Sequence, residues 1–590
     1  MSSFLRPGAA ASSLSAPVFR WSAMREALTP AALFALCSAW ILFTLVGHDP
    51  WKPDEAYTFG LVLDFLKRGD WVVPMLAGEP FLEKPPLFYI TAGAFARAFG
   101  GVLPLPDAAR LASGFYMAIA LAFIALSARE LHRGRHGWTA VLILLGCLGL
   151  IVRAHQLITD LALLAGLSMG IYGLAAGRYH PIRGGLALGG GVAISFLSKG
   201  LLGPGLLGLT SLALPVFPAW RQRAYFRTLC LAAIVALPGI AAWTIALYVR
   251  SPDYFKTWLI TNNLGRFLGA TDPELHQPRF YYAGMLLWYA FPALPLAAWA
   301  IWDACQRGRR AWTEAGIQLP AVLVVVMAVV LGIAADARDS YLMPVLLPLA
   351  LVATAGIDRL PKPAATALAR FGKGAFGLAA LILWLGWIAL LTGTPGVMAR
   401  ALAEFQPGFV DRFAWPSFAL ALLATLAWSF VVWPRTMTAQ RSITQWTSGV
   451  TLFLALVGTL WLPYIDAGKS YRGMVLSLMQ SMPEGNCIAS RHLGEPQRAL
   501  IDYYGHIRTV REEVNATSRC DALLVQGSRT SGAPAAGGEW IPVWQGARPG
   551  DRKELFRLYV RQKPLLAAGS HLPDAVGGRL SDQRRARTRP

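Results

Sequence analysis

A charged pair, Glu83-Lys84, stands where a polar loop meets an apolar stretch, and Pro85 and Pro86 follow it directly. Proline fixes its own φ angle and has no N–H to donate, so the two prolines stiffen the chain and limit where the ammonium can point. Ionisable residues at the edge of apolar segments are candidates for binding a charged group at a membrane surface. Further cations occupy comparable positions at Lys199, Arg266 and Arg338.

Acidic residues occur at two comparable places. Asp54 and Glu55 follow the first apolar run, in a loop that also contains Trp51 and Pro53. A carboxylate held there could act as a general base or bind a sugar or an ammonium group; the alternative is two solvated loop acids. Asp160 comes at the expected start of a helix, where an acid caps exposed amides and suits the helix dipole, and could also orient a substrate.

The cations suit an anionic phosphate, because Lys and Arg are its usual binders. The alternatives are ion pairs with Glu83, Asp54 or Asp336, or snorkelling to lipid headgroups. Glu83 and His276 have metal-ligand character, and two ligands without recognisable spacing give weak support for a divalent ion, zinc or magnesium. We find no P-loop, dinucleotide motif or nucleophile elbow at a plausible place, so no nucleotide cofactor is expected. A transferase would have to take its donor from the lipid phase.

Apolar segments must hold these residues at a membrane. Of the 590 residues, 55% are hydrophobic and 15% charged, and the mean hydropathy is +0.45, which excludes an ordinary soluble protein. Runs of about 20 apolar residues, enough to span a bilayer, recur along the chain. The first follows a basic leader without a small-residue cleavage site, so we interpret it as an uncleaved span. The candidate spans are 29–48, 106–128, 137–154, 160–177, 183–198, 200–218, 229–249, 281–302, 319–335, 341–357, 375–393, 415–433 and 445–464.

The basic loops predict the topology. If the short segment 86–100 does not cross, six loops rich in Lys and Arg fall on the same side as the basic leader; if it crosses, all six move to the other side. We therefore expect 86–100 to be juxtamembrane or re-entrant, about thirteen helices to cross, and the N-terminus to be cytoplasmic. The net charge of +21 then reflects cytoplasmic loops, and no nucleic-acid partner is expected. The loops 49–105 and 250–280 lie outside, so the candidate residues gather on one face.

The composition changes after residue 464. Residues 465–574 read as short strands and helices separated by turns, which predicts a small soluble α/β domain outside the membrane. An Arg-rich tail, 575–590, is expected to be disordered. Cys487 and Cys520 are the two cysteines of this domain, and we predict a disulfide between them because the compartment is oxidising.

Several segments carry a resemblance to a known family. They are the Asp-Glu pair after the first span, "RGDWVVPMLAGEPFLEKPPLFYI" (68–90), "RAHQLITDLALLAG" (153–166), "SKGLLGPG" (198–205), "NNLGRFLG" (262–269) and "SYLMPVLLPLALVA" (340–353). Together they resemble the lipid-A aminoarabinose transferases, which belong with the protein O-mannosyltransferases in the GT-C superfamily. The resemblance spans roughly residues 45–360 and extends in layout to the soluble C-terminal domain.

The resemblance implies a polytopic α-helical enzyme of the bacterial inner membrane. It would transfer a sugar, expected to be 4-amino-4-deoxy-L-arabinose, with inversion from undecaprenyl phosphate to lipid A on the periplasmic face. Another sugar, and another glycan or a protein as acceptor, are the alternatives. The implied catalytic residues are Asp54, Glu55 and Asp160. The implied phosphate-binding residues are Lys84, Arg266 and Lys199. Glu83 and His276 match positions where a metal ion can bind, and Arg338 and Tyr341 would line the cavity.

A transporter or flippase for an anionic lipid is the alternative from another class of protein. A flippase should place its ionisable groups along a path through the bilayer. In this sequence the unusual ionisable residues gather on one face, which favours the enzyme.

Overall fold

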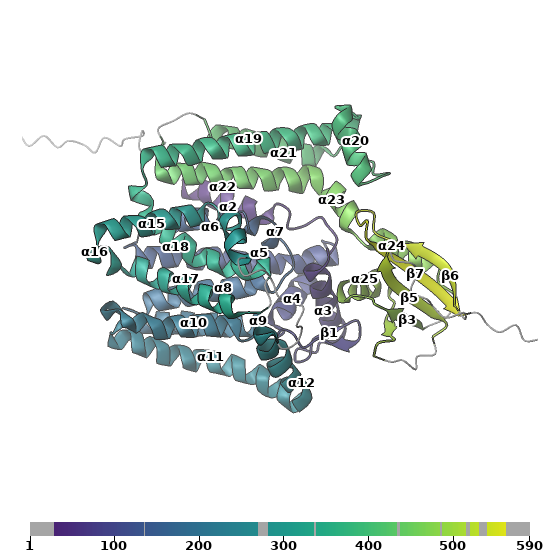
Figure 1. Cartoon of the computed structure of the whole chain (residues 1–590), viewed down its shortest axis with the longest axis horizontal. Coiled ribbons are helices and arrows are strands. Elements are labelled where there is room, and N and C mark those ends of the chain that lie inside the picture. Colours follow the sequence, from purple (N-terminus) through teal and green to yellow (C-terminus); the bar gives the residue numbers. More distant parts are fainter. Residues whose placement is uncertain are drawn as a thin grey trace, which may run out of the picture.

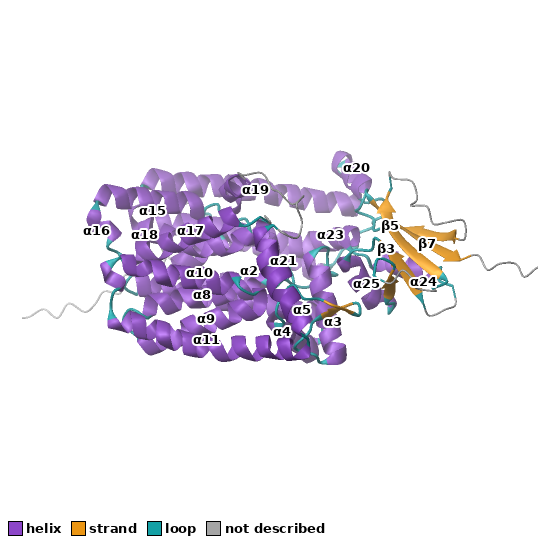
Figure 2. Ribbon diagram, turned by 60° about the horizontal axis from the view of Figure 1, so that its bottom comes forward, coloured by secondary structure: helices purple, strands orange, loops and turns teal. Residues whose placement is uncertain are grey.

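The structure is a computed structural model that describes residues 29–134, 136–269, 281–335, 338–433, 437–483, 487–514, 520–529 and 540–561. A long bundle of helices forms most of the molecule, and a β-sheet lies at one end of it (Figure 1). Figure 2 shows the same division, with the large strands gathered beyond the ends of the helices. The helical bundle and the sheet therefore follow one another along the long axis of the molecule.

Six helical runs are long and apolar enough to cross a bilayer. They are α5 (Leu105–Leu131), α11 (Arg223–Arg250), α17 (Ala315–Ile333), the run of η4 (Asp339–Val345), α18 (Leu346–Gly356) and η5 (Ile357–Arg359), α19 (Lys362–Thr392), and the run of α22 (Ala439–Leu456), η6 (Val457–Trp461) and α23 (Leu462–Lys469). The helices α14 (Tyr281–Tyr289) and α15 (Ala293–Arg307) make a seventh span if they count as one, with a bend of 96° between them. The chain is therefore a multi-pass membrane protein.

Shorter apolar helices complete the bundle. They are α2 (Pro30–Leu42), α4 (Leu87–Phe99), α8 (Asp160–Ala176), α10 (Leu202–Ala213) with η1 (Leu214–Val216), and α21 (Trp415–Val431). Each predicted span contains a helix, with α6 (Gly137–Leu145), α7 (Leu150–Arg153) and α9 (Pro181–Lys199) supplying the remaining ones. The number of helices that cross, about thirteen, stays a prediction.

Glycine lets the helices α8 and α9 approach closely. An added Cβ at Gly173 of α8 would lie 2.3 Å from the backbone nitrogen of Leu188 in α9, so only glycine fits at this contact. The two helices follow each other in the chain and run antiparallel. The first residue of α8, Asp160, therefore lies beside the last residue of α9, Lys199, and the two form an ion pair.

The first long loop forms its own small structure. It contains α3 (Asp54–Arg68), a two-stranded hairpin of β1 (Met75–Leu76) and β2 (Glu79–Pro80), and then α4. A second segment between long helices contains α12 (Pro252–Lys256), the π-helical turn η3 (Thr257–Gly265) and α13 (Arg266–Leu268). The remaining short helices are η2 (Pro218–Trp220), α16 (Arg309–Trp312) and α20 (Gly396–Phe405).

The C-terminal part is a five-stranded mixed sheet in the order β4-β3-β5-β7-β6. Its strands are β3 (Ile488–Arg491), β4 (Thr509–Arg511), β5 (Ala522–Ser528), β6 (Trp540–Gly546) and β7 (Glu554–Arg561), and its helices are α24 (Arg472–Gln480) and α25 (Glu495–Gly505). Strand β3 pairs parallel with β4 and β5, and β7 pairs antiparallel with β5 and β6. The predicted domain boundary at 464 falls inside α23, because the helix continues through polar residues to Lys469. The predicted tail, 575–590, lies outside the described residues.

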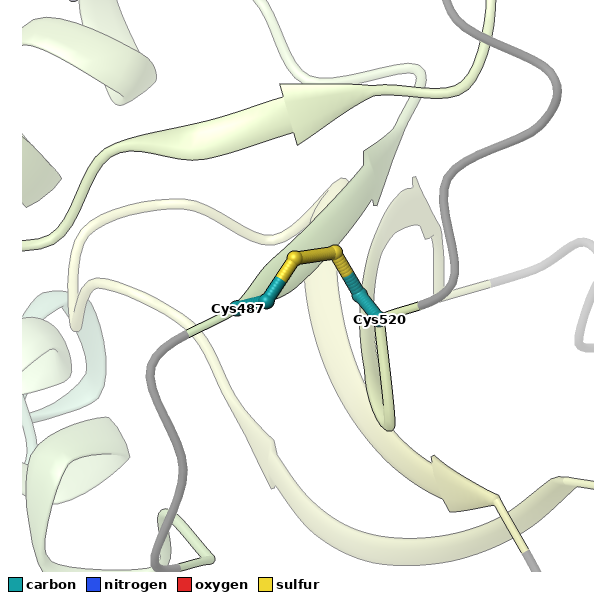
Figure 3. Close-up of a disulfide and its surroundings, with 2 residues drawn as sticks. All are labelled: Cys487 and Cys520. Carbon is teal, nitrogen blue, oxygen red and sulfur yellow. A yellow bond between two sulfur atoms is a disulfide. The ribbon is translucent and has the colours of Figure 1, made fainter.

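The disulfide predicted from the sequence is present. Cys487 lies one residue before strand β3 and Cys520 two residues before its parallel neighbour β5, and their sulfur atoms are bonded (Figure 3). Their Cα atoms are 5.0 Å apart, within the usual range for a disulfide. The bridge therefore joins the starts of two strands that are already paired.

Candidate active site

The ends of several elements meet around one cavity. Its volume is about 320 Å³. The polar part of its wall comes from Glu83, Lys84, Lys199, Asn262, Asn263, Arg266 and Tyr341. The apolar part comes from Leu201, Leu202, Gly205, Leu206, Leu209, Leu264, Phe267, Val330, Leu331 and Ala334. The cavity is therefore amphipathic, with cations at one end and an apolar body between α10 and α17.

Two of the sequence motifs meet at Gly200. This residue has a φ of +71°, which residues with a side chain rarely adopt, so the chain turns sharply after Lys199. A Cβ at Gly200 would lie 2.4 Å from Oδ1 of Asn263, so the two segments touch at a point where only glycine fits. Asn262, the preceding residue, donates from Nδ2 to the carbonyl oxygen of Leu82 at 2.9 Å. The 198–205, 262–269 and 78–86 segments are thus fixed against one another.

Lys84 lies in the cavity wall with a neutral close partner. Its Nζ donates to the Tyr57 hydroxyl at 2.6 Å, and the nearest oxygen of Glu83 is 3.9 Å away. Burial alone would lower the pKa of Lys84, but the neighbouring Tyr89, Glu83, Asp160 and Asp54 outweigh it and raise the pKa above its ordinary value. Lys84 is therefore a firmly charged cation without a close carboxylate contact.

Lys199 and Arg266 each contact a carboxylate. Lys199 donates to Oδ1 of Asp160 and lies over the ring of Tyr341, 5.1 Å from its centroid. Arg266 donates from Nη1 to Oε1 of Glu83 at 2.8 Å. Among the described residues that line the cavity, three are thus cations, Lys84, Lys199 and Arg266, and one, Glu83, is a carboxylate.

Glu83 is neutralised by cations. Burial alone would raise its pKa, but the charges of Lys84, Arg266 and Arg338 lower it below the ordinary value. The described residues contain no group of three or more His, Cys, Asp or Glu that could hold a metal ion. The second expected ligand, His276, lies outside the described residues. Glu83 is paired with Arg266 in this structure, the divalent metal stays a prediction, and we derive no step through one.

Asp54 belongs to a polar group that the sequence only partly indicated. Its Oδ1 accepts from the Tyr57 hydroxyl at 3.3 Å, and its Oδ2 accepts from Nη1 of Arg153 at 3.2 Å. Arg153 also binds both carboxylate oxygens of Asp339, at 2.8 to 3.0 Å. Tyr57 therefore connects Asp54 to Lys84, and Arg153 connects it to the start of η4.

Tyr57, Arg153 and Asp339 were missed as site residues. Two of them lie in or beside segments with the family resemblance. Arg153 is the first residue of "RAHQLITD", and Asp339 directly precedes "SYLMP". Tyr57 lies one helical turn after Asp54, on the same face of α3, which is the signal that could have identified it. Arg338, expected in the cavity wall, is not among the residues that line the cavity, but its charge lowers the pKa of Glu83, whereas Tyr341 does line it.

Glu55 does not join the cavity. We expected it beside Asp54, but its carboxylate is buried and accepts from Nε of Arg110 at 2.6 Å. It also accepts from the backbone nitrogens of Trp51 and Leu157, and Arg110 binds Asp107 on its other side. Consecutive residues of a helix point about 100° apart, so one acid faces the cavity group and the next faces the core. Glu55 is a structural ion-pair residue here.

Comparison with known proteins finds similarity to the proteins that the motifs resemble. Over 361 residues the chain is 30% identical to an undecaprenyl phosphate-α-4-amino-4-deoxy-L-arabinose arabinosyl transferase of Pseudomonas paraeruginosa, covering 59% of this chain and 63% of that protein. Proteins of the same name from Serratia proteamaculans and Edwardsiella ictaluri are 26% identical over 73% and 79% of this chain, and over 75% and 83% of their own lengths. No protein-family model matches the sequence.

The fold agrees with the sequence. The crystal structure of the transferase ArnT from Cupriavidus metallidurans, bound to undecaprenyl phosphate, superposes with a TM-score of 0.65 at 18% identity, covering 90% of this chain and 97% of that one. The chain is similar to the aminoarabinose transferases in sequence and has the ArnT fold. The sequence match spans just under two thirds of the length of the Pseudomonas paraeruginosa transferase. The superposition with ArnT spans nearly all of the ArnT chain.

Proposed function

We propose that the chain is an inverting glycosyltransferase of the bacterial inner membrane. It takes 4-amino-4-deoxy-L-arabinose from undecaprenyl phosphate and transfers it to lipid A on the periplasmic face. The named activity of its relatives and the bound undecaprenyl phosphate in the ArnT structure support the donor. The disulfide supports a periplasmic C-terminal domain, because such bridges persist in oxidising compartments.

The amphipathic cavity carries this proposal. A polyprenyl phosphate has an anionic head and a long apolar tail, and the cavity offers cations at one end and leucine and valine side chains along the rest. Leu201 and Leu209 line the cavity and are 38% and 50% exposed, so the cavity is open along α10. The tail of a donor could therefore enter between α10 and α17 directly from the lipid phase.

The chemistry follows from the charges. An acceptor oxygen attacks the anomeric carbon from the face opposite the phosphate, and the bond from that carbon to the phosphate oxygen breaks. The bonding electrons leave with the phosphate, whose negative charge grows as the bond breaks. Lys84, assisted by Arg266 and Lys199, stabilises that charge more in the transition state than in the bound donor, and this difference is what accelerates the step.

The acceptor decides what Asp54 does. A lipid-A phosphate is already ionised and needs no base, so Asp54 would then hold the positions of Tyr57 and Arg153 around the reacting groups. A hydroxyl acceptor would have to lose a proton, and Asp54 is the carboxylate of the polar group that could take it. Asp160 holds Lys199 in either case.

The mass of lipid A tests the proposal. Lipid A from cells that express the chain should include a species heavier by one aminopentose residue, and cells without the gene should lack it. Cells that express the Lys84→Ala variant at the same level in the membrane should also lack it. An added mass that matches another sugar would replace the aminoarabinose, and an unchanged lipid A with a modified glycan or protein would replace the acceptor.

A further inference from the structure

Helix α25 lies between the C-terminal sheet and α3, the helix that carries Asp54 and Tyr57 (Figure 1). Ala56 of α3 belongs to the apolar core that α24, α25 and the sheet share. The ring of Phe59 meets the ring of Tyr503 in α25 edge-on, with 4.7 Å between their centroids. One face of α3 is therefore part of the core of the C-terminal domain, and a neighbouring face carries residues of the candidate site.

The contact between α3 and α25 leaves no room at Gly60. An added Cβ at Gly60 would lie 2.6 Å from Cβ of Ala499 in α25 and 2.7 Å from Cδ1 of Leu76 in β1. The Cβ of an alanine cannot rotate away, and carbon atoms in contact are ordinarily about 3.5–4.0 Å apart. The two helices would have to separate by about 1 Å to admit a methyl group at Gly60.

The residue of α25 before Ala499 fastens the other segment of the site. Arg498 donates from Nη1 to Glu79 of β2 at 3.1 Å, and Arg511 of β4 donates to the same carboxylate oxygen at 3.1 Å. The side chain of Arg498 is 3% exposed, so this contact is buried. Glu79 precedes Lys84 by five positions in the chain. Consecutive residues of α25 therefore contact α3 and the loop that leads to Lys84.

These two segments meet at the contact between Tyr57 and Lys84. Nζ of Lys84 donates to the Tyr57 hydroxyl at 2.6 Å, and the Tyr57 hydroxyl donates to Oδ1 of Asp54 at 3.3 Å. An ammonium has three donors, so Lys84 can hold Tyr57 and a phosphate oxygen at the same time. A shift of α3 by about 1 Å would disturb the first contact, because hydrogen bonds of this kind are ordinarily no longer than about 3.2 Å.

The C-terminal domain cannot simply move aside to absorb such a shift. Lys52, two residues before Asp54, binds Asp551 at 3.0 Å and Glu554 at 2.7 Å, and both acids belong to the C-terminal domain. Displacing the domain would stretch these ion pairs as well as the buried pair of Arg498 and Glu79. A methyl group at Gly60 should therefore displace α3.

We propose that α25 is the positioning element of the phosphate site: through Ala499 on Gly60 and through Arg498 on Glu79 it holds Tyr57 against Lys84. This inference rests on the proposed function, because it assumes that Lys84 binds the donor phosphate. Gly60 and Arg498 are positioning residues, since they act through Tyr57 and Lys84. The C-terminal domain thereby contributes to the geometry of the site.

The simpler explanation is that the packing of α25 on α3 only stabilises the fold. Under that explanation a methyl group at Gly60 lowers the amount of folded protein, and each folded molecule binds its ligand normally. The two explanations therefore differ in the affinity of the folded protein.

Binding of bare undecaprenyl phosphate to the full chain in lipid nanodiscs separates the explanations, if it is measured per folded molecule below the melting transition. Gly60→Ala should weaken binding about 2- to 10-fold, the range for one hydrogen bond. Single-turnover transfer to lipid A should fall about 10- to 100-fold, because a misplacement of about 1 Å can cost this much. Ala499→Gly removes the Cβ that the new methyl group meets, so Gly60→Ala/Ala499→Gly should recover most of the binding and of the rate.

A double-mutant cycle shows whether Gly60 acts through Tyr57. Tyr57→Phe removes the hydroxyl that Lys84 contacts. In the Tyr57→Phe background Gly60→Ala should weaken binding little further, because two changes to one interaction are not additive. Gly374→Ala, at a glycine of α19 with open space around it, is the matched control and should bind as the wild type does.

Three results would overturn the inference. They are wild-type affinity in a folded Gly60→Ala variant, full additivity with Tyr57→Phe, and no recovery with Ala499→Gly. If Gly60→Ala does not fold, Glu79→Gln decides, because it frees the hairpin from Arg498 at a partly exposed carboxylate and should weaken binding by a similar factor. Wild-type affinity in Glu79→Gln would then overturn the inference. The proposed function fails separately, if the wild type binds undecaprenyl phosphate but transfers no sugar to lipid A.

Discussion

Asp54 and Glu55 show how much a single position changes the role of a carboxylate. Asp54 faces the group of Tyr57 and Arg153 beside the cavity, whereas Glu55 is sealed in the core against Arg110. Burial alone would raise the pKa of Glu55, but the charges of Arg110 and His48 hold the pKa below its ordinary value of 4.5. Substitutions at the two neighbours should therefore have different consequences.

Glu55→Ala should destabilise the protein by about 3–5 kcal/mol, because it leaves Arg110 with a broken buried ion pair. Asp54→Asn should reduce transfer while leaving the melting temperature in detergent nearly unchanged. The stabilisation from Glu55 is complete above pH 4.5 and is lost as the pH falls through its lowered pKa. The difference in melting temperature between wild type and Glu55→Ala should therefore shrink below pH 4.5. Equal melting temperatures at pH 7 would refute the structural role.

Lys84→Ala should lower kcat/KM for transfer by about 100- to 1,000-fold, since it removes the group that stabilises the leaving phosphate. Lys84→Arg should keep part of the activity, because charge matters more than shape for a point contact. Radiolabelled donor and single-turnover rates measure both. Lys256→Ala, which removes an exposed cation from α12, is the matched control. If Lys84→Ala instead melts at a lower temperature and binds donor normally when folded, Lys84 has a structural role.

At the scale of elements, the sequence predicted where helices and strands occur better than which side chains meet. Hydrophobic runs are local in the chain, and the part after residue 464 contains short strands and helices, as expected. The Arg153–Asp339 pair joins residues 186 positions apart, and no local pattern encodes such a contact. Lys84 and Arg266 were identifiable because a cation at the edge of an apolar segment is unusual by itself. Glu55 was misassigned because adjacency to Asp54 does not give the direction of its side chain.

The disulfide between the starts of β3 and β5 can be tested by mass. The chain has six cysteines, so denatured, non-reduced protein should take up four alkyl groups, and reduced protein should take up six. Cys520→Ala should lower the stability of the sheet by roughly 3–4 kcal/mol, because the bridge closes a 33-residue separation in the unfolded chain. Hydrogen exchange of β3 and β5 measures the loss. Six labels without reduction would show that no bridge forms.

At the scale of the whole molecule, the helix α3, the hairpin strand β1 and the sheet lie toward the same end of the bundle (Figure 1). The helix α4 (Leu87–Phe99) is 13 residues long, about 20 Å at 1.5 Å per residue, which is shorter than the hydrocarbon core of a bilayer. This length agrees with the expectation that 86–100 is juxtamembrane or re-entrant. Length alone does not separate α4 from a crossing helix, because α2, which lies in an expected span, has the same number of residues.

Reporter fusions test the topology directly. A fusion at Gly134 should report a cytoplasmic position and one at Gly101 a periplasmic position, because the basic loops are retained inside. The two sites flank α5 (Leu105–Leu131), a helix long and apolar enough to cross, so their signals should differ. A periplasmic signal at Gly134, or a cytoplasmic one at Gly101, would reverse the orientation and remove the periplasmic site.

The opening of the cavity between α10 and α17 bears on how the rate depends on concentration. If the donor enters sideways from the bilayer, the protein meets it at a density set by lipid composition and not by the volume of the sample. The rate should then follow the mole fraction of donor in the nanodisc or micelle. Adding empty detergent at constant total donor should slow the reaction, and adding buffer should not. The apparent KM is then a surface quantity, so values measured in different detergents become comparable once they are expressed as mole fractions.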